Sequence, residues 1–216
     1  SLINIAIKKE NEERFFSLWN TWRCQNRLVT IDGRYYGKYC KTRICPICNS
    51  IRKANIINRY LPVLQTWAEP YFVTLTIKAC KANKLNGRLK AMIRAMRQIT
   101  GKHRKANQRG EGIKLMGIKS LECNFNPVLK TYNPHFHLIV PDKKTANLLM
   151  TEWLKKWTVH FASGSAQDKR PITDLQKCLI EVIKYGSKIF TEPDIHKKVK
   201  GVSDRDIYAA ALYNII

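Results

Sequence analysis

Apolar side chains recur at the spacing of an amphipathic helix in several parts of the chain. The segments predicted as helices on this basis are residues 12–22, 50–67, 85–99, 145–161, 175–190 and 204–213. Pro62 lies near the end of the second segment and predicts a break or kink there, because proline cannot donate the helical hydrogen bond.

Other segments carry β-rich or turn-forming patterns. Residues 71–77 hold two threonines and no helical period, which predicts a central strand. Residues 113–125 and 135–140 are predicted to be antiparallel strands, joined through residues 126–134. We expect residues 24–48 to be irregular, with a turn at Asp32–Gly33. The basic, glycine-bounded segment 101–112 is interpreted as a loop, either in contact with DNA or simply solvated.

Helices that alternate with antiparallel strands predict an α+β fold, in which helices flank a central antiparallel sheet. We divide the chain into an N-terminal helical and cysteine-containing segment, residues 1–68, and a larger unit, residues 69–216. The sequence shows no internal repeat.

The charge of the chain points to a polyanionic partner. The 39 Lys and Arg against 16 Asp and Glu give a formal net charge of +23, with a pI near 9.9. Such an excess favours nucleic acid. A membrane is not expected as a partner, since no long apolar run or basic amphipathic helix is present. Without a signal peptide we expect a cytoplasmic protein, and without an initial Met we expect further residues beyond either end.

Two histidines, His135 and His137, lie in an apolar strand pattern. Successive side chains of a strand point to opposite faces, so the two imidazoles project together. They form half of a site for a divalent metal, or else are two tolerated polar residues. In the preceding strand, alternation puts Glu122 on the same face. The predicted set of two imidazoles and one carboxylate suits Mn²⁺ or Mg²⁺, although Glu122 could instead pair with Lys119 or Lys130.

The cysteines form a second group. Cys40, Cys45 and Cys48 are spaced x4 and x2, and Cys24 is the nearest fourth thiol. Four thiolates predict a structural, tetrahedral Zn²⁺ site, with a redox pair at Cys45 and Cys48 as the alternative. Basic residues around this cluster are predicted to bind nucleic acid: Arg43, Arg52 and Lys53.

A third group surrounds Tyr185. On a helix, Glu181 and Lys188 would flank Tyr185 on one stripe. A phenol needs a nearby cation to favour its nucleophilic phenolate, and a carboxylate one turn away could accept a proton. The alternative is an ordinary half-buried tyrosine with a solvated ion pair beside it.

Taken together, these residues resemble the HUH endonucleases, and in particular the rolling-circle plasmid replication initiators (Rep proteins) with one catalytic tyrosine. The resemblance runs in order through residues 39–48, 72–77, 121–126, 133–137 and 181–188. The glycine that follows the tyrosine, Gly186, leaves the local helix geometry open, because glycine weakens a helix by about 1 kcal/mol relative to alanine.

The resemblance implies an RRM-like catalytic sheet in residues 69–216 and a nick in single-stranded or hairpin DNA at a replication origin. His135, His137 and Glu122 would hold the metal, and Tyr185 would form a 5′-phosphotyrosine and leave a free 3′-OH. Lys188 would orient the phosphate or favour phenolate, Glu181 would activate water for a second cleavage, and Lys184 would bind DNA. Host helicase and polymerase are candidate further partners, and the coding element would be a bacterial plasmid or other mobile element.

Two other interpretations remain open from the sequence. A transposase with the same single-tyrosine chemistry would show the same residues. A zinc-containing DNA-binding module without catalysis would use only the charge and the cysteine cluster. A covalent DNA adduct would separate the second interpretation from the first two.

Overall fold

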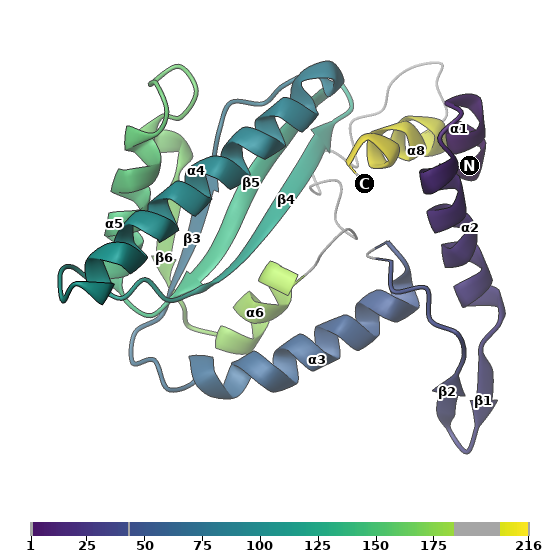
Figure 1. Ribbon diagram of the computed structural model, residues 1–216, viewed down its shortest axis with the longest axis horizontal. Coiled ribbons are helices and arrows are strands. Elements are labelled where there is room, and N and C mark those ends of the chain that lie inside the picture. The colour runs from purple at the N-terminus through teal and green to yellow at the C-terminus, as the bar shows by residue number, and fades with distance from the viewer. Residues whose placement is uncertain (1, 43, 184–203, 216) are drawn as a thin grey trace.

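A computed structural model of the protein describes residues 2–42, 44–183 and 204–215. Its centre is a four-stranded antiparallel sheet of strand order β4-β5-β3-β6 (Figure 1). The strands of this sheet are β3 (Tyr71–Thr76), β4 (Ile118–Asn126), β5 (Thr131–Val140) and β6 (Asp168–Pro171). Strand β3 pairs on both sides, so the predicted central strand is confirmed.

Helices cover both faces of the sheet. Helices α4 (Ala82–Gln108) and α5 (Lys143–Lys155) pack on one face, and α3 (Pro46–Leu64) and α6 (Leu175–Ile183) on the other (Figure 1). The first core includes Val73, Leu75 and Phe136 from the sheet, and the second includes Phe72 and Ile139. Alternate residues of the same strands therefore supply the two cores, and the predicted α+β class is confirmed.

The turn between β4 and β5 sets the register that the site depends on. The Asn126 side-chain oxygen accepts hydrogen bonds from the backbone N–H groups of Val128 and Leu129, each at 3.1 Å. These local bonds hold the chain in a tight turn. In the resulting register, Glu122 lies directly opposite His135. A slip of one residue would turn the Glu122 side chain to the other face.

The N-terminal part forms a helical assembly with a small hairpin. It contains α1 (Leu2–Lys8), α2 (Glu12–Asn26) and the strands β1 (Val29–Ile31) and β2 (Arg34–Tyr36). Asp32 and Gly33 both have positive φ, which the twist of a two-residue hairpin requires, so the predicted turn is confirmed. The C-terminal helix α8 (Asp204–Ile215) packs between α1 and the β4–β5 hairpin, through Tyr213 and Ala211. The division at residue 68 stays a prediction.

Several predicted elements need correction. Residues 101–108 are not a loop, because α4 continues through Gly101 to Gln108 and buries His103. Pro62 does not break α3, since it lies in the last turn. The helix expected at 145–161 ends at Lys155, and the strand expected from residue 113 begins at Ile118. The elements α1, β1, β2 and β6 were not predicted from the sequence. Among the described helices, none is long and apolar enough to span a bilayer.

Candidate metal centres and nucleic-acid interface

The structure brings Glu122, His135 and His137 together on one face of the sheet. One ligand atom from each lies within 4.8 Å of the others. The Glu122 carboxylate oxygen Oε2 is 4.0 Å from Nε2 of His135 and 3.8 Å from Nε2 of His137. These three side chains are mostly buried, with exposed fractions of 9%, 7% and 15% respectively. The group, here called the His–Glu triad, has the donor set and convergence that fit a divalent cation.

Neighbouring polar groups orient each member of the triad. The Nδ1–H of His135 donates to the Asn133 carbonyl oxygen at 2.9 Å, which makes Nε2 the ring nitrogen that carries the lone pair. The Thr74 hydroxyl lies 3.2 Å from Nδ1 of His137 and can accept from it in the same manner. The Ser120 hydroxyl donates to Glu122 at 3.3 Å. Outer partners of this kind fix the tautomer and orientation of metal-ligating histidines. None of these three partners was predicted from the sequence.

Helix α6 approaches the same face of the sheet. Its residues Val182 and Ile183 pack in one core with Phe72 and Ile139, and the Phe72 ring lies 5.1 Å from the His137 ring. Glu181 is half-buried on this helix. Tyr185, Lys184 and Lys188 lie outside the described residues. The described part of α6 therefore ends two positions before Tyr185, on the face that carries the triad.

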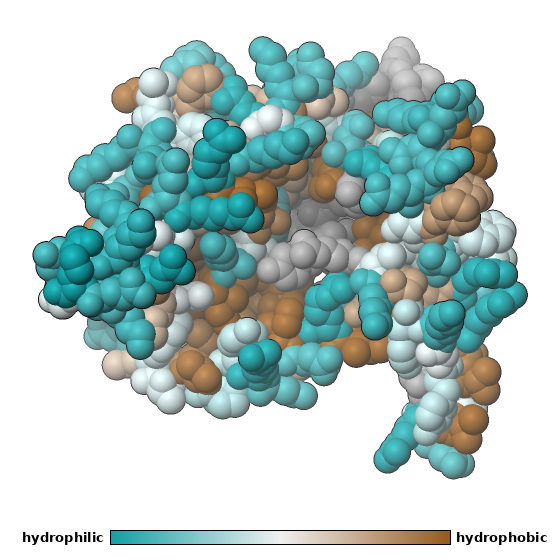
Figure 2. Space-filling model, in the orientation of Figure 1, coloured by the Kyte–Doolittle hydropathy of each residue, from teal (hydrophilic) through white to brown (hydrophobic). Residues whose placement is uncertain are grey.

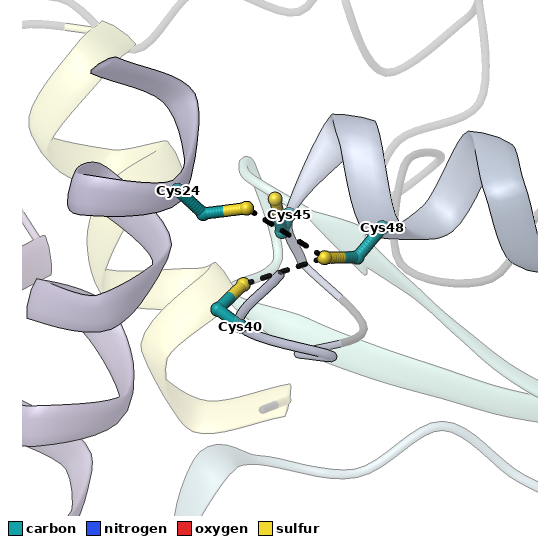
Figure 3. A group of neighbouring side chains, drawn as sticks. All are labelled: Cys24, Cys40, Cys45 and Cys48. Carbon is teal, nitrogen blue, oxygen red and sulfur yellow. Dashed lines mark hydrogen bonds between the residues drawn. The ribbon is translucent and has the colours of Figure 1, made fainter. Parts of the chain in front are cut away.

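Four thiols converge at the junction of α2 and α3 (Figure 3). Cys24 comes from α2, Cys40 and Cys45 from the loop before α3, and Cys48 from the first turn of α3. All four are free thiols, and their sulfur atoms lie within 4.8 Å of one another. The backbone N–H of Lys41, which has a φ of 59°, donates to the Cys48 sulfur at 3.2 Å. This arrangement, here called the four-cysteine cluster, fits a tetrahedral zinc ion.

The thiols of the four-cysteine cluster have different electrostatic surroundings. Burial raises the pKa of Cys48 to about 12 and raises the pKa of Cys45 as well. Burial also acts to raise the pKa of Cys40, but hydrogen bonds from the side chain and backbone of Thr42, and from Cys48 and Cys45, outweigh it and lower the pKa to about 7. Protonated, buried thiols are costly to convert to thiolates without a cation. A metal dication would provide that compensation for Cys45 and Cys48.

The basic residues near the four-cysteine cluster that were predicted to bind nucleic acid differ in how far the structure describes them and in what they contact. The Arg52 guanidinium donates to the Lys41 carbonyl oxygen at 2.9 Å, so this side chain braces the loop that holds Cys40. Lys53 is half-buried on α3. Arg43 lies outside the described residues. The role of these side chains in DNA binding stays a prediction.

A larger basic surface lies on α4, and the sequence pattern indicated it only in part. This helix has 27 residues and no Asp or Glu (Figure 2 shows the hydrophilic side chains over it). The pKa of Lys119 in the adjacent β4 is lowered, first by burial and then by the nearby charge of Arg97. The exposed cations of α4, here called the α4 cation row, are Lys84, Lys90, Arg94, Arg97, Lys102, Arg104 and Lys105. The basic residues were visible in the sequence, but the predicted loop at 101–112 assigned them to two separate elements instead of one helix.

Comparison with known proteins identifies the class to which this arrangement belongs. A family model described as "Replication protein" (Rep_1) matches residues 34–200, which include the triad and three of the four clustered cysteines. The chain belongs to this family of replication proteins. No solved structure matches the chain.

Curated relatives carry the name "Protein rep". One from Bacillus sp is 26% identical over 150 residues, which cover 66% of this chain and 47% of the relative. One from Bacillus amyloliquefaciens is 26% identical over 150 residues, covering 66% and 42%. A third, from Staphylococcus aureus, is 27% identical over 170 residues, covering 71% of each chain. The chain thus spans about half the length of the first two relatives.

Proposed function

We propose that this protein is a replication initiator that nicks single-stranded or hairpin DNA at the origin of a bacterial plasmid or related mobile element. The observation that carries the proposal is the convergence of His135, His137 and Glu122 on one face of the sheet. Helix α6 covers this face, and its described part ends at Ile183, two positions before Tyr185 in the sequence. Membership of the replication protein family favours replication over transposition. Such an enzyme would act in the cytoplasm, beside the host helicase and polymerase.

In the proposed reaction, the phenolate oxygen of Tyr185 attacks the phosphorus of the scissile phosphodiester. The new bond is a 5′-phosphotyrosine, and the bond that breaks joins phosphorus to the 3′ oxygen, which takes a proton to become the 3′-OH primer. The Lys188 ammonium would hold the phosphate or favour the phenolate. Glu181 would later accept a proton from the water that attacks the phosphorus of the phosphotyrosine. The bond from phosphorus to the Tyr185 oxygen would then break, which releases the strand with a 5′-phosphate and regenerates the tyrosine.

The triad would hold Mn²⁺ or Mg²⁺, which supplies charge stabilisation to the oxygens of the scissile phosphate. The chain's own contribution is to keep both Nε2 atoms aimed at Glu122, through Asn133 and Thr74. The four-cysteine cluster would hold Zn²⁺ in a structural role that fixes α2 against α3.

Replacing Tyr185 with phenylalanine should abolish the covalent DNA adduct and leave DNA affinity almost unchanged, since only the attacking oxygen is removed. A labelled single-stranded origin oligonucleotide, incubated with Mn²⁺ and run on a denaturing gel, measures the adduct. Glu181→Ala is the matched comparison, and it should form the adduct normally but release it slowly. An adduct that persists in Y185F refutes the nucleophile, and normal release in E181A removes Glu181 from the mechanism.

The α4 cation row should make DNA binding strongly salt-dependent. We expect the triple substitution Lys90→Gln, Arg94→Gln and Arg104→Gln to weaken binding for every sequence, because bonds to phosphate carry no base information. The slope of log affinity against log salt should decrease by about 0.7 for each single-strand phosphate that is no longer neutralised, and by about 0.9 for each duplex phosphate. Fluorescence anisotropy measures both the affinity and the slope.

A charge-matched control removes the same charge elsewhere, by Lys8→Gln, Arg23→Gln and Lys38→Gln, at exposed positions off α4. If both triple variants lower the slope equally, net charge alone explains the binding. The α4 cation row would then not be a DNA surface.

A further inference from the structure

A cavity of about 620 Å³ opens beside the His–Glu triad. Its floor comes from side chains on the same face of the sheet as the triad. Asn124 and Asn126 are two and four positions from Glu122 along β4, and Asn133 and Thr131 are two and four positions from His135 along β5. Its wall is the segment after α5, with Val159, His160 and Phe161. None of the described residues that line it is acidic. The cavity thus combines neutral hydrogen-bonding groups with an apolar and aromatic wall.

This cavity shares residues with the surroundings of the triad. Thr76 is the register partner of His135, and its hydroxyl donates to the Asn133 side-chain oxygen at 3.1 Å. The Asn133 carbonyl is the group that orients His135. A single-stranded DNA whose scissile phosphate lies at the triad would therefore place an adjoining nucleotide over the cavity.

Hydrogen bonds fix the wall of the cavity before any ligand binds. The Lys78 backbone N–H donates to the Phe161 carbonyl oxygen at 2.7 Å. The buried Gln167 side chain accepts from the Thr76 N–H at 2.8 Å and donates to the carbonyl oxygens of Thr76 and Ser163, at 3.3 and 2.9 Å. The Trp153 indole N–H donates to the same Thr76 carbonyl at 3.1 Å. A preformed wall lowers the ordering cost of binding.

The chemistry of the lining matches an unpaired nucleobase. A carboxamide offers both a donor and an acceptor, and it can pair with two adjacent atoms on a base edge. In single-stranded nucleic acid, bases splay out and stack on aromatic side chains, and the exposed His160 ring can provide such a surface. The Arg88 guanidinium lies over the neighbouring Phe161 ring at 4.1 Å, so Phe161 forms part of the apolar wall. The Lys78 ammonium, 3.0 Å from Nε2 of His160, lies at the same cavity and suits a backbone phosphate.

We propose that this cavity binds the base of a nucleotide next to the scissile phosphate, turned out of the stack, and that Asn124 and Asn133 read its edge. The inference rests on the proposed nicking function, because the triad supplies the position of the phosphate. The carboxamide oxygen of Asn126 accepts two backbone N–H groups of the β4–β5 turn, so Asn126 serves as part of the floor. The carboxamide oxygen of Asn133 accepts from the Thr76 hydroxyl, so Asn133 offers its NH₂ group to the base, whereas Asn124 offers both a donor and an acceptor.

The test uses origin oligonucleotides in which each base near the cut is exchanged or removed in turn. Anisotropy without added Mn²⁺ or Mg²⁺ measures binding without cleavage and leaves the four-cysteine cluster undisturbed. The unaltered protein should show one flanking position where an abasic site weakens binding by roughly tenfold to a hundredfold. Asn124→Ala should abolish this preference, and Asn133→Ala, at an exposed position, should reduce it. Asn20→Ala, an exposed substitution on α2, should keep the preference in full.

The outcomes separate the cavity from the nicking chemistry. A protein that nicks but shows the same base preference in N124A and N133A as without substitution overturns the cavity proposal alone. A preference that depends on Asn124 without any nicking supports the cavity and refutes the proposed function. If no flanking position matters to binding, the base-reading role is wrong.

Discussion

Replacing His137 with alanine should lower Mn²⁺ affinity and reduce metal-dependent nicking by at least about a hundredfold. The expected loss exceeds the roughly 10- to 100-fold effect of removing a group that only orients a metal ligand, because the variant removes one of the three proposed metal ligands. Nε2 of His137 lies 3.8 Å from Glu122, so its removal leaves the carboxylate with a single imidazole neighbour in the triad. Isothermal titration calorimetry with Mn²⁺ gives the affinity independently of catalysis. Gel analysis of the origin oligonucleotide gives the activity.

Two further variants sharpen this prediction. Thr74→Val keeps the volume of the side chain but removes the hydroxyl beside Nδ1 of His137, so it should weaken metal binding less than His137→Ala does. His103→Gln lies on α4, against the opposite face of the sheet, and should leave Mn²⁺ binding intact. Full nicking in chelator, or equal metal affinity in H137A and H103Q, would dismiss the triad as a metal site.

The triad could be predicted from the sequence because strands have a period of two. With residues 135–140 and the preceding segment as paired strands, alternation alone placed Glu122 on the face of His135 and His137. The register also argues against the alternative partner Lys119, which lies opposite Leu138 on the other face. What alternation could not supply was the direct opposition of Glu122 and His135, because the Asn126 turn determines it.

Strand β6 and the last turns of helix α4, residues 101–108, escaped prediction because neither showed a clear hydrophobic pattern. Strand β6, Asp168–Pro171, is fully exposed and polar, and it exists because its backbone pairs with the outer edge of β3. Helix α4 passes through Gly101, which suggested a loop. The buried pair Ile99 and His103 shows that the helical period continues past the glycine. The wall of the cavity depends on Gln167, which bonds to a strand 91 positions away, and no local pattern reveals such a long-range bond.

The second large effect concerns the four-cysteine cluster. Removing zinc should unfold the junction of α2 and α3 while the central sheet remains folded. Within the described residues, the buried hydrophobic core around the four sulfur atoms consists of the cysteines themselves, with half-buried Tyr39 and Ile47 beside them. So small a core cannot fix α2 against α3. The other buried contact of α2, Leu18 against Ala6 and Tyr213, joins α2 to α1 and α8 and leaves the junction with α3 unsupported. A structural zinc ion contributes on the order of 10 kcal/mol in small zinc-dependent folds.

The measurement combines zinc content with hydrogen exchange. Cys48→Ser should lower the bound zinc and raise amide exchange in α2 and in the first turns of α3, because the Cys48 sulfur lies 3.7 Å from that of Cys24 and 3.6 Å from that of Cys40. Cys178→Ser is the matched control, since this half-buried cysteine packs near α6 and lies away from the cluster. It should retain one zinc ion per chain.

Amide hydrogen exchange in the strands of the central sheet shows whether zinc stabilises only the α2–α3 junction or the whole protein. The core beneath α4 and α5 contains Phe136, Trp153 and Met96, and among the residues that the structure describes it shares no member with the four-cysteine cluster. We therefore expect β3 and β5 to keep their protection in C48S, and Mn²⁺ binding at the triad to persist. Unchanged exchange in α2 after complete zinc removal would show that the four thiols do not depend on a metal. Loss of protection throughout the sheet would show that the N-terminal segment and the central sheet fold as one unit.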